Sequence, residues 1–209
     1  MFNSLGMIGI SAILGAVYAV TAYLIGSIPT GYLIVKAKTG QDIREVGSGS
    51  TGATNVKRVL GKKWFFIVML LDAIKGALPV VAAGYFSSDY NVFGIYPVIA
   101  AVFVIIGHSK PVFLGGKGGK SVASGVGTIL ALNWQVGLIL AVIWSIITYF
   151  TKYVSVGSII TLLLSPVLMY LFKAPAAYVI YCAIAAIYVT YLHRENIKRL
   201  MKGEENKVR

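Results

Sequence analysis

The most prominent pattern in the chain is a series of long apolar runs separated by short polar segments. The runs cover residues 7–36, 64–86, 92–107, 119–132, 134–151, 155–172 and 175–193. Runs of about 20 apolar residues are long enough to cross a bilayer as helices. The apolar positions are continuous rather than alternating, which favours helices over a membrane barrel. The pattern therefore predicts an all-α integral membrane protein.

The fourth and fifth runs are separated only by Asn133. Taken together, residues 119–151 are too long for one comfortable span and fit a tight hairpin of two helices. We therefore expect seven transmembrane helices, one of them short, in a single domain over residues 1–209. Five or six spans would remain if the short helix is re-entrant. The first run has no basic residue before it, so we expect a retained span rather than a cleaved signal peptide.

The composition supports this class and adds an orientation. Hydrophobic residues make up 57% of the chain and charged residues only 12%, against roughly 25% charged in soluble domains. Of the nineteen Lys and Arg residues, seventeen lie in four polar segments, residues 36–63, 108–120, 152–154 and 194–209. The positive-inside rule then places these segments in the cytoplasm, the N-terminus outside and the C-terminus inside. The net charge of +12 thus indicates topology and anionic ligands, and not nucleic acid.

The first cytoplasmic segment is rich in glycine and hydroxyl residues. Gly47, Gly49 and Gly52 match G-x-G-x-x-G, but no strand precedes them, so a dinucleotide fold is not expected. Glycines let backbone N–H groups converge on an anion, and a helix beginning at Asn55 would favour a phosphate at its N-terminus. Arg58 could contact a phosphate with two nitrogens. A flexible solvated linker is the alternative, and the density of donors favours anion binding. The hydroxyl donors are Ser48, Ser50, Thr51 and Thr54.

The second cytoplasmic segment, residues 107–121, is a basic glycine-rich loop. Gly119, Lys120 and Ser121 resemble the end of a P-loop, but the first glycine of that motif would fall at Leu114. A nucleotide site is therefore not supported. An anion-binding loop and an ordinary basic loop against lipid headgroups both remain open.

The remaining polar residues of interest lie in or near the apolar runs. Asp72 and Lys75 are spaced for a structural ion pair, which we favour over a functional charge pair. Ser155 has the default interpretation of a helix N-cap. His193, like His108, is more typical of a headgroup or carbonyl partner than of a catalyst. Cys182 lies within an apolar run with no acid or His nearby in sequence, and the chain shows no metal-ligand spacing.

Taken together, four stretches resemble the bacterial acyl-phosphate:glycerol-3-phosphate acyltransferases of the PlsY type. They are Gly26-Ser27-Ile28-Pro29-Thr30-Gly31, the segment from Asp42 to Arg58, the segment from Gly107 to Lys120, and His193-Arg194-Glu195-Asn196-Ile197. The resemblance covers essentially the whole chain. Ser50 stands where many members carry Asn, so no role is assigned to it.

The resemblance implies a seven-helix enzyme of the bacterial inner membrane with its site at the cytoplasmic face. It would transfer a fatty acyl group from acyl phosphate to the 1-hydroxyl of glycerol 3-phosphate, giving lysophosphatidic acid and phosphate. We expect direct transfer without an acyl-enzyme, no cofactor, no metal and no obligatory protein partner. An organic-phosphate transporter or exchanger is the alternative. The implied catalytic residues are Ser48, Arg58, Lys120 and His193, and the implied substrate contacts are Gly49, Gly52, Thr54, Asn55, Ser155 and Asn196.

Overall fold

The computed structural model describes residues 4–87 and 94–207, and every regular element within these ranges is helical. The first two residues of the expected run at 92–107 lie outside the described residues. Two single turns of 3-10 helix, Ile43–Glu45 and Val112–Leu114, lie in the polar loops. The α-helices are α1 (Ser4–Ser27), α2 (Thr30–Thr39), α3 (Ala53–Leu60), α4 (Lys62–Phe86), α5 (Ile95–Ser109), α6 (Val122–Leu132), α7 (Trp134–Thr151), α8 (Val154–Leu171), α9 (Ala176–Leu192) and α10 (Arg194–Met201).

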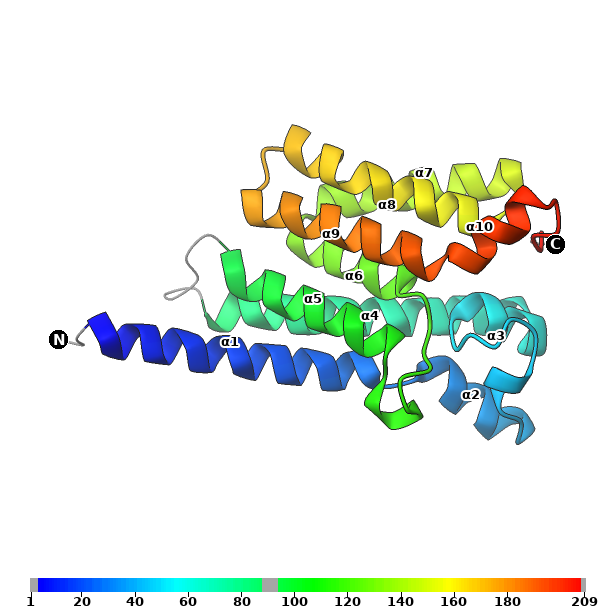
Figure 1. Cartoon of the computed structure of the whole chain (residues 1–209), viewed down its shortest axis with the longest axis horizontal. Coiled ribbons are helices and arrows are strands. Elements are labelled where there is room, and N and C mark those ends of the chain that lie inside the picture. Colours follow the sequence, from blue (N-terminus) through cyan, green and yellow to red (C-terminus); the bar gives the residue numbers. More distant parts are fainter. Residues whose placement is uncertain (1–3, 88–93, 208–209) are drawn as a thin grey trace.

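The long helices form an elongated bundle, with α2, α3 and α10 gathered at one end (Figure 1). In the described part of the chain, five helical segments are long and apolar enough to cross a bilayer. A sixth is added if α9 and α10, which meet at a bend of 59°, count as one span. The helix α6 is apolar but shorter than these. The expectation of an all-α integral membrane fold is confirmed, with five or six candidate spans.

The first apolar run, residues 7–36, has no interruption in its hydrophobic pattern, but the structure divides it into two helices. The helix α1 ends at Ser27, and α2 begins at Thr30 after a break at Ile28 and Pro29. Proline has no N–H group and disfavours helical geometry at the residue before it, so the break falls where Pro29 dictates. The break expected at Asn133 is confirmed. Asn133 separates α6 from α7, and its side chain accepts a hydrogen bond from the backbone N–H of Val136 at 3.0 Å.

The short helix α6 is inserted deeply into the bundle. A side-chain carbon at Gly76 of α4 would collide with the Ser124 backbone, and one at Gly127 would collide with the Ala73 backbone. Such small residues allow two membrane helices to approach at backbone distance. At the same level, the hydroxyls of Thr128 and Tyr181 lie 2.6 Å apart and connect α6 to α9.

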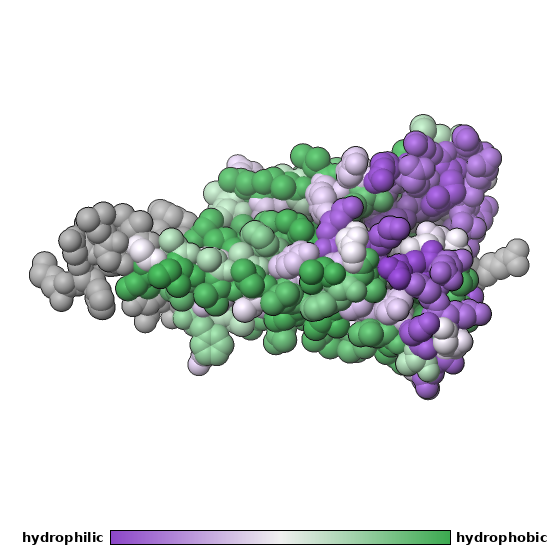
Figure 2. Space-filling model, turned by 60° about the horizontal axis from the view of Figure 1, so that its bottom comes forward, coloured by the Kyte–Doolittle hydropathy of each residue, from purple (hydrophilic) through white to green (hydrophobic). Residues whose placement is uncertain are grey.

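The surface is divided between apolar flanks and one polar end. Figure 2 shows hydrophobic residues along the helices and hydrophilic residues concentrated at the end that carries α2, α3 and α10. Bulky apolar side chains such as Leu70, Val142 and Leu163 are more than half exposed. That distribution suits a bundle whose flanks contact lipid chains and whose polar end contacts water.

Candidate active site

A cleft of about 320 Å³ opens between the loops of the polar end and the adjoining turns of the bundle. One part of its wall is polar and comes from the loop before α3, from the segment before α6, and from the junction of α9 with α10. The other part is apolar and comes from α4, α6 and α7. The apolar lining includes Phe65, Met69, Leu70, Val122, Val126, Ala141 and Trp144.

The cleft brings together residues from four separate stretches of the sequence. Nine of the ten predicted site residues line it: Ser48, Gly52, Thr54, Asn55, Arg58, Lys120, Ser155, His193 and Asn196. The exception is Gly49, which does not line the cleft. Gly49 has a positive φ of 68° and its N–H bonds the carbonyl of Val46 at 3.1 Å, so it shapes the loop from behind.

Asn55 organises the first loop from within. Its amide nitrogen lies 2.9 Å from the carbonyl of Val46 and 3.0 Å from that of Ser50. Its side-chain oxygen accepts from the backbone N–H of Ser48 at 3.0 Å. Asn55 is 1% exposed. Its polar atoms are therefore engaged by the loop, so that Asn55 shapes the loop, and it also lines the cleft. The expected contact of Asn55 with substrate stays a prediction.

Two glycines allow this loop to fold so tightly. Gly47 has φ of +63°, and a side-chain carbon there would collide with the side-chain oxygen of Asn55. At Gly31 in α2, such a carbon would collide with the carbonyl oxygen of Thr51. The loop is thus clamped between α2 and α3. The expected helix is present as α3. The N–H groups of Asn55 and Val56 bond the carbonyl of Gly52 at 3.0 and 3.2 Å, so the N–H groups of Ala53 and Thr54 are the ones left without an acceptor inside the helix.

The second loop packs closely against α5. The N–H groups of Gly118 and Gly119 bond the carbonyls of Ser109 at 3.3 Å and His108 at 3.1 Å. A side-chain carbon at Gly119 would collide with the His108 ring. These glycines therefore serve close packing, which delivers Lys120 to the cleft. The two loops also touch, because the Arg44 guanidinium lies 3.4 Å from the carbonyl of Leu114.

Arg44 is itself held by a carboxylate on the same loop. It makes several hydrogen bonds to Asp42, one of them 2.6 Å long. The hydrogen bonds from Arg44 lower the pKa of Asp42 to about 2, so that Asp42 stays ionised. This pair keeps Arg44 out of the cleft. By contrast, the Arg58 side chain is exposed, lines the cleft, and makes no hydrogen bond or ion pair with the described residues 4–87 and 94–207.

The remaining predicted residues meet near the start of α10. The ammonium of Lys120 contacts the side-chain oxygen of Asn196. Nδ1 of His193 lies 2.8 Å from the carbonyl of Val189. A carbonyl only accepts, so Nδ1 carries the proton and Nε2 is an acceptor in the neutral ring. His193 is thus a carbonyl partner, as the sequence suggested, and it also lines the cleft.

Ser155 is not the helix cap that its position suggested. The N-cap of α8 is Tyr153, which makes no side-chain capping bond. Ser155 lies in the first turn, is 3% exposed, and donates to the carboxylate of Glu205 at 2.9 Å. Sequence reasoning missed Glu205, because an acidic residue near a charged C-terminus carries no pattern of its own. It also missed Arg199, which lines the same part of the cleft.

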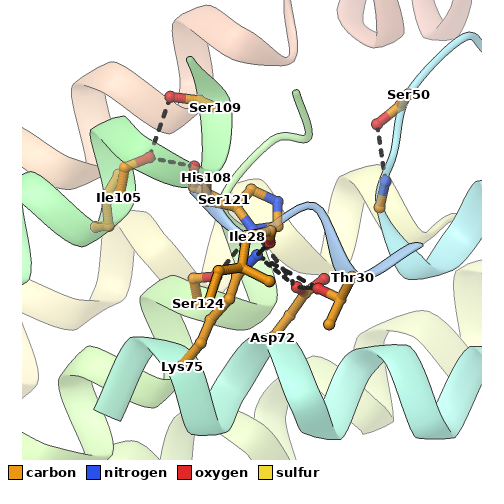
Figure 3. A network of polar contacts seen from close by, with 11 residues as sticks. Ile28, Thr30, Ser50, Asp72, Lys75, Ile105, His108, Ser109, Ser121 and Ser124 are labelled. Atoms are coloured by element: carbon orange, nitrogen blue, oxygen red, sulfur yellow. Dashed lines mark hydrogen bonds and ion pairs between the residues drawn. The ribbon is translucent and has the colours of Figure 1, made fainter. Parts of the chain in front are cut away.

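A buried polar network lies beneath the cleft, and Figure 3 shows Asp72 and Lys75 of α4 directed toward the break between α1 and α2. The two form the expected ion pair at 2.9 Å. Lys75 donates to the carbonyl of Ile28 at 2.7 Å, and Thr30 donates to Asp72. Lys75 thus gives a second donor to the Ile28 carbonyl at the helix break, which also accepts from the N–H of Thr30 at 3.1 Å. His108 lies 3.7 Å from Asp72, and both line the floor of the cleft.

The described residues contain no group of three or more His, Cys, Asp or Glu side chains that could hold a metal ion. Cys182 is fully buried in the bundle core and does not line the cleft. The cleft therefore offers hydroxyls, amides and cations for binding anions, next to an apolar groove.

Comparison with known proteins relates this arrangement to one family. The family model described as glycerol-3-phosphate acyltransferase matches residues 5–203. A glycerol-3-phosphate acyltransferase of Trichormus variabilis is 41% identical over 93% of this chain and 91% of its own length. One of Prochlorococcus marinus is 46% identical over 90% of this chain and 94% of its own.

Two solved structures of PlsY (YgiH), an integral membrane glycerol 3-phosphate acyltransferase, share the fold. The glycerol 3-phosphate form has a TM-score of 0.87 and 35% identity, and covers 93% of this chain and 96% of that one. The lysophosphatidic acid form has a TM-score of 0.85 and 33% identity, with coverage of 93% and 95%. With a family model spanning nearly the whole chain and relatives above 40% identity, this chain belongs to the glycerol-3-phosphate acyltransferase family.

Proposed function

We propose that this chain is a membrane acyltransferase that moves a fatty acyl group from acyl phosphate to the 1-hydroxyl of glycerol 3-phosphate. The observation that carries the proposal is one cleft in which cationic and hydroxyl side chains adjoin an apolar groove. The polar wall suits two phosphate-bearing substrates. The apolar wall suits a fatty acyl chain. PlsY structures in glycerol 3-phosphate and lysophosphatidic acid forms support this choice of acceptor and product.

The two substrates would occupy different parts of the cleft. Ser48 of the loop before α3, Thr54 in the first turn of α3 and the free N–H groups at the start of that helix would hold the phosphate of the donor. Arg58 and Lys120 would hold the phosphate of glycerol 3-phosphate. The other acceptor contacts would come from Ser155, His193 and Asn196. The acyl chain would lie along Met69 and Val126.

Direct transfer fits these residues without a covalent intermediate. The oxygen of the glycerol 1-hydroxyl attacks the carbonyl carbon of acyl phosphate, and the ester C–O bond forms as the C–O bond to phosphate breaks. The hydroxyl proton passes to an oxygen of the departing phosphate, so the products are lysophosphatidic acid and inorganic phosphate. Holding the reacting atoms together can supply about 7–11 kcal/mol. Cys182, buried away from the cleft, has no part in this route.

We further propose that seven helices, α1 and α4 to α9, cross the bacterial inner membrane with the N-terminus outside. The start of α1 and the end of α10 lie at opposite ends of the bundle (Figure 1), as an odd number of crossings requires. Seventeen of the nineteen basic residues belong to four polar segments of the sequence, and the described parts of these segments lie at the polar end (Figure 2). By the positive-inside rule that end, and the cleft with it, faces the cytoplasm.

The test is to incubate the purified protein with acyl phosphate and glycerol 3-phosphate and to measure lysophosphatidic acid and phosphate. We expect both products in equal amounts, and none of them when acyl-CoA replaces acyl phosphate. Equal turnover with acyl-CoA would overturn the donor assignment. Uptake of glycerol 3-phosphate into proteoliposomes without product formation would instead support an organic-phosphate transporter.

A further inference from the structure

Glu205 is a carboxylate that the C-terminal tail turns back into the cleft. After α10 the chain reverses at Gly203, whose φ is +71°, and the N–H of Glu204 bonds the carbonyl of Arg199 at 2.8 Å. The side chain of Glu205 is only 6% exposed, whereas its neighbour Glu204 is exposed. A carboxylate in this position requires partners, because burying an unpaired charge is costly.

Three donors from two helices converge on this one carboxylate. Ser155 Oγ and Asn196 Nδ2 lie 2.9 Å and 2.6 Å from Oε1, and Arg199 Nε lies 2.8 Å from Oε2. Burial alone would raise the pKa of Glu205, but the hydrogen bonds from Asn196, Arg199 and Ser155 outweigh burial and hold the pKa below its usual range. Glu205 is therefore ionised at neutral pH and accepts from every partner.

The carboxylate sets the direction of the hydrogen bonds around it. An ionised carboxylate only accepts, so Asn196 must turn its NH₂ group toward Glu205. The side-chain oxygen of Asn196 then faces the ammonium of Lys120, which it contacts. If the Asn196 amide were reversed, its NH₂ group would face the Lys120 ammonium. Both groups are donors, so Asn196 could not accept a hydrogen bond from Lys120. Glu205 thus acts on Lys120 through Asn196, although the glutamate and the lysine make no direct hydrogen bond.

The negative charge of Glu205 also offsets the positive charges of Lys120, Arg58 and Arg199 in this part of the cleft. Arg58, Arg199 and the neutral His193 are the other titratable groups that face Lys120. Without the negative charge of Glu205, Arg199 and Lys120 would repel each other across the cleft. Removing it would displace one or both cations, and not merely loosen the tail.

We propose that Glu205 is a positioning residue for the acceptor half of the site, which orients Asn196 and through it holds Lys120 toward the phosphate of glycerol 3-phosphate. The inference rests on the proposed function, because it takes the cleft to be the acceptor site. Glu205 is itself an anion and does not bind the phosphate directly, because like charges repel. Its loss should therefore weaken acceptor binding and leave the loop before α3 undisturbed, because the hydrogen bonds of Glu205 to the described residues go to Ser155, Asn196 and Arg199 and not to that loop.

The test compares Glu205→Gln and Glu205→Asp with the matched control Glu204→Gln in the full-length protein. Initial rates are measured against glycerol 3-phosphate and, separately, against acyl phosphate, together with the thermal unfolding midpoint in detergent. We expect Glu205→Gln to raise the KM for glycerol 3-phosphate about tenfold or more, with the donor KM within about twofold. Glu205→Asp should restore part of that loss, and Glu204→Gln should match the wild type.

Combining the substitutions tests the route of action. If Glu205 acts through Lys120, adding Glu205→Gln to Lys120→Ala should cost little beyond the single Lys120→Ala change. Should Glu205→Gln fail to fold, Glu205→Ala, which also removes the carboxylate, is measured in its place, and a wild-type acceptor KM in that variant would overturn the proposal.

Three further results would also overturn it. A lower acceptor KM in Glu205→Gln would show that the carboxylate competes with the phosphate for the same donors. An equal rise in KM for glycerol 3-phosphate and for acyl phosphate, together with a lower unfolding midpoint, would show that Glu205 has a purely structural role. Strict additivity with Lys120→Ala would show independent action. A wild type without turnover would instead contradict the proposed function, so the two failures are distinguishable.

Discussion

Replacing Lys120 with alanine probes the acceptor side of the proposed site most directly. Lys120 lies at the end of the second cytoplasmic loop, partly buried, with its ammonium against the side-chain oxygen of Asn196. Burial is the main cause that lowers its pKa to about 8, and the nearby Arg199 lowers it further. Glu205 acts in the opposite direction. Lys120 is therefore mostly a cation at pH 7, and it loses the proton in mildly alkaline solution.

The expected size of the effect follows from the contact that is lost. A hydrogen bond to a charged group contributes about 1.5–3 kcal/mol, and about 1.4 kcal/mol corresponds to a factor of ten. Lys120→Ala should thus lower kcat/KM for glycerol 3-phosphate roughly 10- to 150-fold. Since the pKa is lowered, the binding cation is present below pH 8 and lost above it. In the wild type, kcat/KM should therefore fall as the pH rises through about 8.

The assay is phosphate release at varied glycerol 3-phosphate between pH 6 and pH 10. Lys120→Arg, which stays charged throughout, should shift the alkaline decline to higher pH. Lys117→Ala on the same loop is the control, because Lys117 is exposed and does not line the cleft. If Lys120→Ala retained wild-type kcat/KM, or if Lys117→Ala lost as much, the reasoning would be refuted.

Three further outcomes test other parts of the proposal. Arg58→Lys should lower kcat/KM about tenfold or more, because a compact ammonium cannot replace a planar fork that binds two phosphate oxygens; unchanged kinetics would remove Arg58 from the phosphate site. Cys182→Ala should leave turnover within about twofold, and a radiolabelled acyl-protein trapped without acceptor would contradict direct transfer. A cysteine at Ser50 should react with an impermeant reagent only from the cytoplasm and one at Lys173 only from outside; labelling of both from one side would rule out seven spans.

The sequence by itself determined the membrane class, most of the helix boundaries and the polar segments that carry the site. These features are local. A span needs a continuous apolar run because lipid cannot satisfy backbone groups, and a break needs a residue such as Asn133, which caps the next helix. The glycine-rich loop before α3 was also predictable, since tight turns require glycine at positions such as Gly47. The break at Pro29 is also a local feature, because proline disfavours a continuous helix. It was missed because the residues around Pro29 belong to one uninterrupted apolar run.

Only the tertiary structure decided which side chains meet and what each one does there. Ser155 and Glu205 are 50 residues apart, and Lys120 and Asn196 are 76 apart, so no local pattern relates them. Their contacts exist because α8, α10 and the loop before α6 pack around one cleft. Tertiary packing also decides that the Asn55 side chain hydrogen-bonds the loop before α3, and that Gly119 lies against the His108 ring. A helix pattern records which face is apolar, but the partner of a polar side chain depends on the arrangement of the whole bundle.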